Sequence, residues 1–141
     1  MKTVDKTIIK DSESLQLRAY LCPAGVWTVG WGHTGPDVYK GLVVTQGEAE
    51  VLLERDLRAS ESAINSLVKV RLSQDQFDAL VSLVFNIGAG AFKDSTLLRL
   101  LNTGDFDGAA GQFKRWNKSK GKVLNGLTTR RNREEKLFSG G

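Results

Sequence analysis

Three side chains near the N-terminus have types that could carry out acid–base or nucleophilic chemistry. Glu13 supplies a carboxyl group, Cys22 is the only cysteine, and Thr28 supplies a hydroxyl. Cleavage of a glycosidic bond needs an acid that protonates the leaving oxygen, and a second group that activates water or attacks the anomeric carbon. A carboxyl group, a thiol that acts as base or nucleophile, and a hydroxyl that holds water would meet these needs. Glycoside hydrolysis is therefore one candidate chemistry.

The spacing of these residues does not by itself make a site. A straight strand of nine steps spans about 30 Å, so Glu13 can approach Cys22 only if the chain bends between them. Each residue also has a purely structural interpretation. Glu13 can cap or solvate the end of a helix, a lone cysteine such as Cys22 is commonly an inert buried thiol, and Thr28 suits a strand.

The segment around the three residues has the pattern of a β-hairpin. In "SLQLRAY" (residues 14–20) apolar and polar residues alternate, which is typical of a strand. "CPAG" (residues 22–25) follows, with a proline and a glycine placed for a turn. "VWTVGWGH" (residues 26–33) is rich in β-branched and aromatic residues. We therefore predict a hairpin over residues 15–33, with a third strand near residues 38–44.

Most of the remaining chain has helical periodicity. Thr45 with Glu48 forms a capping-box pattern that predicts a helix over residues 46–67. At about 1.5 Å per residue this helix spans about 30 Å, which is long enough to link two lobes. Ser73 with Gln76 is a second capping box, and it precedes a largely apolar helix.

Shorter elements are predicted at both ends and between the helices. A short helix capped by Thr3 or Asp5 runs through about residue 10. Residues 117–122 are predicted to be a basic loop or a helix break. "GAGAF" and "GKVLNG" lack the residues of a phosphate-binding loop and are predicted to be helix breaks. Further helices are predicted over residues 95–103, 105–116 and 127–138.

The order and spacing of these motifs resemble a known family. Glu13 is followed after eight residues by Cys22 and after five more by Thr28, and "TVGWGH" runs from Thr28 to His33. This resembles the phage-type lysozymes, the muramidase endolysins of bacteriophages, whose hallmark is Glu-x8-Asp-x5-Thr leading into Thr-x-Gly-x-Gly-His. "VSLVFNIGAGAFKDSTLLRLLNTGDFDGAAGQF" and "GLTTRRNREEKLF" are similar to the central helical segment and the C-terminal helix of that family.

The resemblance implies an α+β fold of two lobes. A small N-terminal lobe with an antiparallel hairpin or sheet, residues 12–45, would be linked by the helix over residues 46–67 to a mostly helical lobe, residues 68–141 plus the N-terminal helix. Residues 1–141 would form a single lysozyme domain. The active-site cleft would lie between the two lobes.

The resemblance also implies a role for each of the three residues. Glu13 would be the general acid, Cys22 the base that activates water or the nucleophile, and Thr28 the residue that fixes the water. Cys22 stands where most members carry aspartate, so the chain resembles a subgroup with a Glu-Cys-Thr triad. A free thiol has a pKa near 8.5 and is only a few per cent thiolate at neutral pH. Catalysis would gain from a lower pKa, which we expect to come from Arg18 or from a basic residue of the helical lobe.

Composition excludes several other classes of protein. Apolar residues make up 40% and charged residues 26% of the chain, as in ordinary globular domains. One cysteine forms no internal disulfide, and one histidine with one cysteine forms no standard zinc site. No apolar run approaches the ~20 residues that span a bilayer. The net charge of +4 and pI of about 9.3 fit either a solvated basic surface or attraction to a polyanion.

We expect His33 to be a structural, hydrogen-bonded or ion-paired residue, with a proton shuttle as the alternative.

The sequence thus predicts an enzyme that hydrolyses the β-1,4 bond between N-acetylmuramic acid and N-acetylglucosamine in peptidoglycan, and so lyses the bacterial host. We expect no metal or cofactor, a monomer, the glycan strands of peptidoglycan as partner, no nucleic acid, and no stable membrane anchor in this chain. The enzyme would wait in the host cytoplasm until released to the periplasmic wall. Two alternatives stay open: a lytic transglycosylase, which cleaves the same bond without adding water, and a non-catalytic basic module that binds peptidoglycan or nucleic acid.

Overall fold

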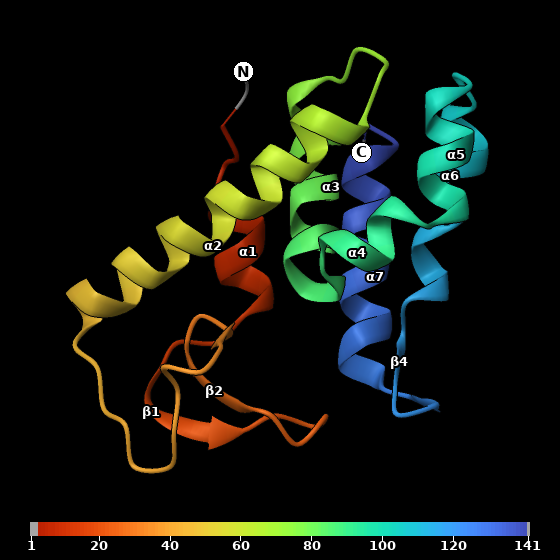
Figure 1. The fold of residues 1–141 in the computed structure, drawn as a ribbon. Coiled ribbons are helices and arrows are strands. Elements are labelled where there is room, and N and C mark those ends of the chain that lie inside the picture. Colours follow the sequence, from red (N-terminus) through yellow and green to blue (C-terminus); the bar gives the residue numbers. More distant parts are fainter. Residues whose placement is uncertain (1–2, 141) are drawn as a thin grey trace.

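A small antiparallel sheet and a larger group of helices make up the computed structural model, which describes residues 3–140 (Figure 1). The long helix α2 runs from the sheet to the helical part. This arrangement confirms the predicted α+β class with a small sheet and a mostly helical lobe. The elements in chain order are α1 (Thr7–Ser12), β1 (Gln16–Leu21), β2 (Trp27–Gly30), β3 (His33–Thr34), α2 (Gln46–Leu67), α3 (Gln74–Ile87), α4 (Ala89–Lys93), α5 (Thr96–Asn102), α6 (Phe106–Ala110), the 3-10 helix η1 (Phe113–Arg115), β4 (Lys118–Ser119), β5 (Lys122–Val123) and α7 (Asn125–Phe138).

The predicted hairpin is present, but the third strand is not where the sequence placed it. β1 pairs with β2, and β2 pairs with β3, which is only His33–Thr34. The prediction of a strand near residues 38–44 was wrong, because two turns bend this segment: Val38 N–H donates to the Gly35 carbonyl and Leu42 N–H to the Tyr39 carbonyl. Only its last residues run beside β1, where Val43 forms an isolated bridge with Arg18.

Both capping boxes form as predicted. The Thr45 hydroxyl accepts the Glu48 N–H while the Glu48 carboxylate accepts the Thr45 N–H, and Ser73 and Gln76 make the same reciprocal pair at the start of α3. Each pair satisfies two of the N–H groups that a helix start leaves without a partner. α2 and α3 therefore begin where their sequences indicate, and α3 ends at Gly88, whose φ of 92° suits glycine.

Several shorter elements differ from the sequence predictions. The first helix begins only at Thr7, whose N–H is accepted by the Asp5 carboxylate. The helix predicted over residues 105–116 stops at Ala110 and continues as the separate 3-10 helix, since two glycines reduce its helix propensity. "GAGAF" begins with the predicted helix break, since Gly88 separates α3 from α4, but its next four residues belong to the short helix α4.

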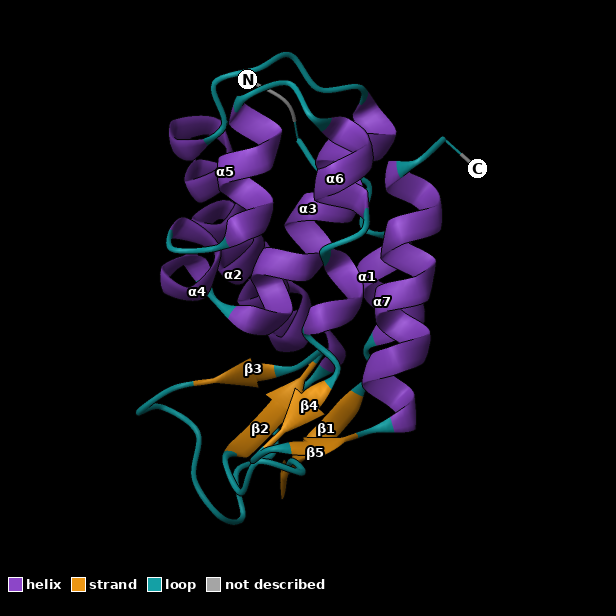
Figure 2. Ribbon diagram, turned by 90° about the vertical axis from the view of Figure 1, so that its right-hand side faces the viewer, coloured by secondary structure: helices purple, strands orange, loops and turns teal. Residues whose placement is uncertain are grey.

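The basic segment over residues 117–122 is a β-hairpin and not a loop or helix break. Lys118 pairs with Val123 and Ser119 with Lys122, and the two residues between the strands have positive φ, 51° at Lys120 and 79° at Gly121. Positive φ at both positions is the geometry of a two-residue hairpin turn. This hairpin is a separate two-stranded sheet beside the N-terminal end of α7: it overlaps β1 and β2 in the view of Figure 2, but Figure 1 shows β4 apart from them.

The core is built around α3. Its residues 77–84 are all buried, because α3 packs against both α2 and α7. Phe138 closes the far end of α7 on Phe113, with ring centroids 5.3 Å apart. α7 has an unusual buried face, since Arg130, Arg131 and Glu134 are buried there with Phe138.

Candidate active site

A cleft of about 880 Å³ separates the sheet from the helical part, and it is larger than two other surface pockets of about 530 and 380 Å³. Glu13, Cys22 and Thr28 all line it from the side of α1 and the sheet. The opposite wall comes from the C-terminal end of α3, from α4, from β4 and from the first turns of α7, and includes Trp116 and Arg130. The three residues that the sequence singled out therefore share one cavity.

β1 is not a straight strand between Glu13 and Cys22. Its register against β2 shifts between Gln16 and Tyr20, which marks a bulge. A bulge bends a strand and increases its local twist. The irregularity lies between Glu13 and Cys22, which both line the cleft.

Glu13 is held on two sides. It follows the last residue of α1, and its N–H is accepted by the Ile9 carbonyl at 2.8 Å, which fixes its backbone. Its side chain is 20% exposed, and Oε2 lies 3.2 Å from Nη1 of Arg130. On the other side Gly32 has a φ of 76°, and a Cβ there would be 2.7 Å from Glu13 Oε1. The chain therefore needs a glycine at residue 32 both for its backbone conformation and to leave room for the carboxyl group.

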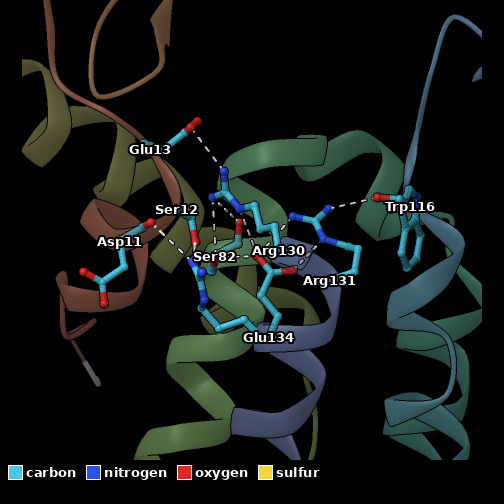
Figure 3. A network of polar contacts seen from close by, with 9 residues as sticks. Asp11, Ser12, Glu13, Ser82, Trp116, Arg130, Arg131 and Glu134 are labelled. Carbon is cyan, nitrogen blue, oxygen red and sulfur yellow. Dashed lines mark hydrogen bonds and ion pairs between the residues drawn. The ribbon is translucent and has the colours of Figure 1, made fainter. Parts of the chain in front are cut away.

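Arg130 belongs to a buried polar network (Figure 3). Its Nη2 donates to the Ser82 carbonyl at 3.2 Å, and its Nε donates to Oε2 of Glu134, also at 3.2 Å. The Ser82 hydroxyl donates to the same carboxylate oxygen of Glu134. Because Arg130 is bonded to both α3 and α7, its guanidinium is fixed before it meets Glu13.

Glu134 also binds a second arginine. Glu134 is fully buried, and so is this second arginine, Arg131. Oε1 of Glu134 lies 2.7 Å from Nε of Arg131. The Arg131 Nη1 donates to the Trp116 carbonyl at 3.4 Å. A single buried carboxylate thus holds two arginines, one directed at Glu13 and the other at the backbone of the cleft wall before β4.

Cys22 lies at the start of the turn between β1 and β2. Its N–H is accepted by the Val26 carbonyl at 3.0 Å, and its carbonyl accepts the Gly25 N–H at 2.8 Å. Partial burial acts to raise the pKa of the thiol, but hydrogen bonds with the backbone of Val26, Ala24 and Gly25 and with the Thr28 hydroxyl outweigh it, so the pKa lies below its ordinary value. The expected source, Arg18 or a basic residue of the helical lobe, is therefore wrong: the turn itself stabilises the thiolate.

Thr28 is almost completely buried in β2, with 3% of its surface exposed. Its hydroxyl donates to the Val26 carbonyl at 2.9 Å. A hydroxyl has one proton and two acceptor positions, so in this orientation it can accept a hydrogen bond from a water molecule in the cleft. To donate to the Cys22 thiolate it must give up the bond to Val26.

His33 points away from this chemistry. Its Nδ1 lies 2.8 Å from Oδ2 of Asp56 on α2, and its Nε2 lies 3.0 Å from Oδ2 of Asp37. Burial acts to lower the pKa of His33, but the two aspartates outweigh it and raise the pKa overall. The expected structural, ion-paired histidine is confirmed.

Sequence reasoning missed Arg130 and Gly32 as members of the site. A signal for Arg130 was present, because Arg130 and Glu134 stand at i and i+4 on one face of a helix. The pattern did not show that this face is buried, since charged residues are mostly exposed. The signal for Gly32 lay in "TVGWGH", but the partner that requires a glycine comes from another element.

Comparison with known proteins identifies the family of this chain. Residues 10–134 match the family described as phage lysozyme. The chain belongs to the phage lysozyme family. It is 48% identical over 135 residues to the endolysin of Acyrthosiphon pisum secondary endosymbiont phage 1, with 93% of this chain and 92% of the relative covered. It is 46% identical over 133 residues to the endolysin of Bacillus phage B103, with 93% of this chain covered, but it spans only 51% of that relative. The endolysin from Escherichia coli O157:H7 phage FAHEc1 has the same fold, with a TM-score of 0.87, 37% identity, and 99% and 94% of the two chains covered.

Membership of the phage lysozyme family confirms the predicted class of activity. The chain is a glycoside hydrolase of the endolysin and muramidase type, and the family acts on peptidoglycan. No helix among residues 3–140 combines the length and the apolar character needed to cross a bilayer.

Proposed function

We propose that Glu13, Cys22 and Thr28 form a Glu-Cys-Thr triad that hydrolyses the β-1,4 bond between N-acetylmuramic acid and N-acetylglucosamine. The main support is that all three line one cleft, which also contains an arginine bonded to the carboxylate of Glu13. The cleft is open to an extended polymer, since both of its walls carry exposed residues.

Glu13 acts as the general acid. It gives its proton to the glycosidic oxygen as the bond breaks, which leaves a carboxylate. Arg130, 3.2 Å away, stabilises that carboxylate by charge and hydrogen bonding. Arg130 is a positioning residue here, because its contacts with Ser82 and Glu134 fix the direction from which it meets Glu13.

Cys22 and Thr28 supply the water. Thr28 accepts a hydrogen bond from the water, and the thiolate of Cys22 takes a proton from it as the water attacks the anomeric carbon. The lowered pKa of Cys22 supports this role, because it enlarges the thiolate fraction at neutral pH. Attack of water on the face opposite the leaving group inverts the anomeric configuration. A retained configuration in the first product would instead assign Cys22 as the nucleophile.

The biological setting proposed for this enzyme follows from its family. We propose that residues 1–141 work as one monomeric lysozyme domain, divided into residues 12–45, the helix over 46–67 and residues 68–141 with the N-terminal helix. The enzyme remains in the host cytoplasm until a separate permeabilising protein releases it to the periplasmic wall. Analytical ultracentrifugation tests the monomer, and fractionation of cells before and during lysis tests the location.

The proposed role of Glu13 is tested by the variant Glu13→Gln. Glutamine has the same shape and still accepts a bond from Arg130, but it cannot donate a carboxyl proton. We expect a loss of roughly 100- to 10,000-fold in the rate of turbidity loss of chloroform-treated Gram-negative cells. An unchanged melting temperature would show that the variant is folded. Lysis at the wild-type rate would contradict the assignment of Glu13.

A further inference from the structure

The β4–β5 hairpin brings unpaired positive charge to the mouth of the cleft. Lys118 lines the cleft, and Lys118, Lys120 and Lys122 are all exposed. Among the described residues, 3–140, the other ionic side chains that line the cleft are those of Glu13 and Arg130, and these two pair with each other. Within residues 3–140, no lysine of this hairpin has a carboxylate within 4 Å, whereas Lys6 and Lys10 each pair with a glutamate.

The turn of this hairpin directs Lys120 across the cleft. Lys120 has a positive φ of 51°, the only non-glycine residue with positive φ in the described part of the chain. A Cβ at Gly25 would lie 3.4 Å from the Lys120 Nζ, so the ammonium group lies against the turn that carries Cys22. Lys120 itself does not line the cleft, but its ammonium group thus reaches the β1–β2 turn, of which Pro23 and Ala24 do line the cleft.

We propose that Lys118 and Lys120 form a subsite for a carboxylate of the substrate, namely a carboxylate of the peptide stem on N-acetylmuramic acid. This inference rests on the proposed hydrolysis of peptidoglycan and names the part of the substrate that the hairpin binds. The sugar rings are uncharged and give a cation no ionic partner, whereas the stems carry free carboxylates. An ammonium–carboxylate contact is charge-assisted and stronger than a neutral hydrogen bond.

Lys122 provides a matched control on the same hairpin. It stands opposite Ser119 in the two-stranded ladder, whereas Lys118 stands opposite Val123. Side chains of successive ladder pairs point to opposite faces, so Lys122 and Lys118 lie on different faces of the hairpin. Lys122 is exposed and does not line the cleft. A change at Lys122 removes the same charge from the same element without touching the subsite.

The experiment compares two substrates: purified peptidoglycan with the carboxylates of its stems free, and the same peptidoglycan after these carboxylates have been converted to neutral amides. We measure the ratio of kcat/KM on the two substrates at low ionic strength for the wild type, Lys118→Gln with Lys120→Gln, and Lys122→Gln. The wild type should prefer the substrate with free carboxylates, and in the double variant the ratio should fall about two- to fivefold for each lysine replaced. Lys122→Gln should keep the wild-type ratio, and Lys118→Arg with Lys120→Arg should restore most of it.

Added salt should reduce the preference of the wild type, because exposed charge pairs are screened. The proposal is overturned if the double variant keeps the wild-type ratio, or if Lys122→Gln lowers the ratio equally, which would indicate a general effect of net charge. Failure of the proposed function looks different: the wild type would then release no hydrolysis product from either substrate.

Discussion

At the scale of single residues, the proposed site has Cys22 where the resemblance to the family implies aspartate in most members. The β1–β2 turn resolves the chemical difficulty of that exchange, since its hydrogen bonds lower the pKa of Cys22. The sequence predicted the need for a lower pKa but not its source. Turn hydrogen bonds depend on backbone geometry, which the residue types alone do not show.

Replacing Cys22 by aspartate should keep much of the activity and change its pH dependence. The thiolate is lost as the pH falls through the pKa of Cys22, whereas an aspartate stays ionised down to about pH 4. The acid limb of the activity profile should therefore lie at lower pH in Cys22→Asp than in the wild type. Glu13 is present in both proteins, so the difference between the two profiles reports on residue 22.

Two further measurements decide whether the thiol is needed at all. Cys22→Ala and alkylation of the wild-type thiol should each greatly reduce wall lysis, and the alkylating reagent should leave Cys22→Asp active. Full activity after both treatments would remove Cys22 from the mechanism.

Gly32 should matter for activity beyond its backbone conformation. In Gly32→Ala the new Cβ would be 2.7 Å from Glu13 Oε1, so the carboxyl group must move. Gly41→Ala is the matched control, because Gly41 has a φ of 92° but no atom within 4 Å of a Cβ. Both variants should lose about 1–2 kcal/mol of stability from the positive φ. Only Gly32→Ala should lose most of its lytic activity, and equal losses in the two would refute a specific contact with Glu13.

At the scale of elements, prediction succeeded where the signal is local. The Thr45–Glu48 and Ser73–Gln76 boxes satisfy helix-start N–H groups within four residues, so the starts of α2 and α3 could be read from the chain. The β4–β5 hairpin could not be predicted, because its lysine-rich strands lack β-branched residues except Val123, and "KG" is not the usual Asn-Gly turn signal. The predicted strand near residues 38–44 does not form, because two turns bend this segment and leave little of it to pair with β1.

The link between β3 and α2 depends on His33. Its raised pKa means that protonated His33 stabilises the fold through Asp37 and Asp56. That stabilisation is complete below the ordinary histidine pKa of 6.5 and is lost as the pH rises through the raised value. His33→Gln should therefore be less stable than the wild type by about 1 kcal/mol near pH 5, with a smaller difference near pH 9. Urea unfolding at the two pH values measures this, and a difference that grows with pH would contradict it.

At the scale of the whole molecule, one network joins α3 and α7 to Glu13, the proposed catalytic acid. Glu134 connects α7 with Ser82 of α3, with Glu13 through Arg130, and with Trp116 through Arg131. Sequence alone could not place these groups together, because Ser82 and Glu134 are 52 positions apart and Glu13 and Arg130 are 117 positions apart. Three buried charged residues on one helix are also contrary to the usual distribution of charge.

Removal of Glu134 should be far more damaging than removal of its neighbour. Glu134→Gln leaves two buried arginines without their carboxylate, which should cost about 3–5 kcal/mol of unfolding free energy. Glu135→Gln, on the same helix but only partly buried, should change stability by less than about 0.5 kcal/mol. Urea unfolding of the two variants gives the comparison, and similar values would show that the network contributes little.

The central claim, hydrolysis in the cleft with Glu13 as acid, is tested most directly by mass spectrometry of the fragments released from purified peptidoglycan. Our account predicts that the wild type releases muropeptides whose N-acetylmuramic acid ends have gained one water, and that Glu13→Gln releases almost none. Anhydro ends without the added water would indicate a transglycosylase, and hydrated fragments from Glu13→Gln at the wild-type rate would show that Glu13 is not the acid. Either result would contradict the account.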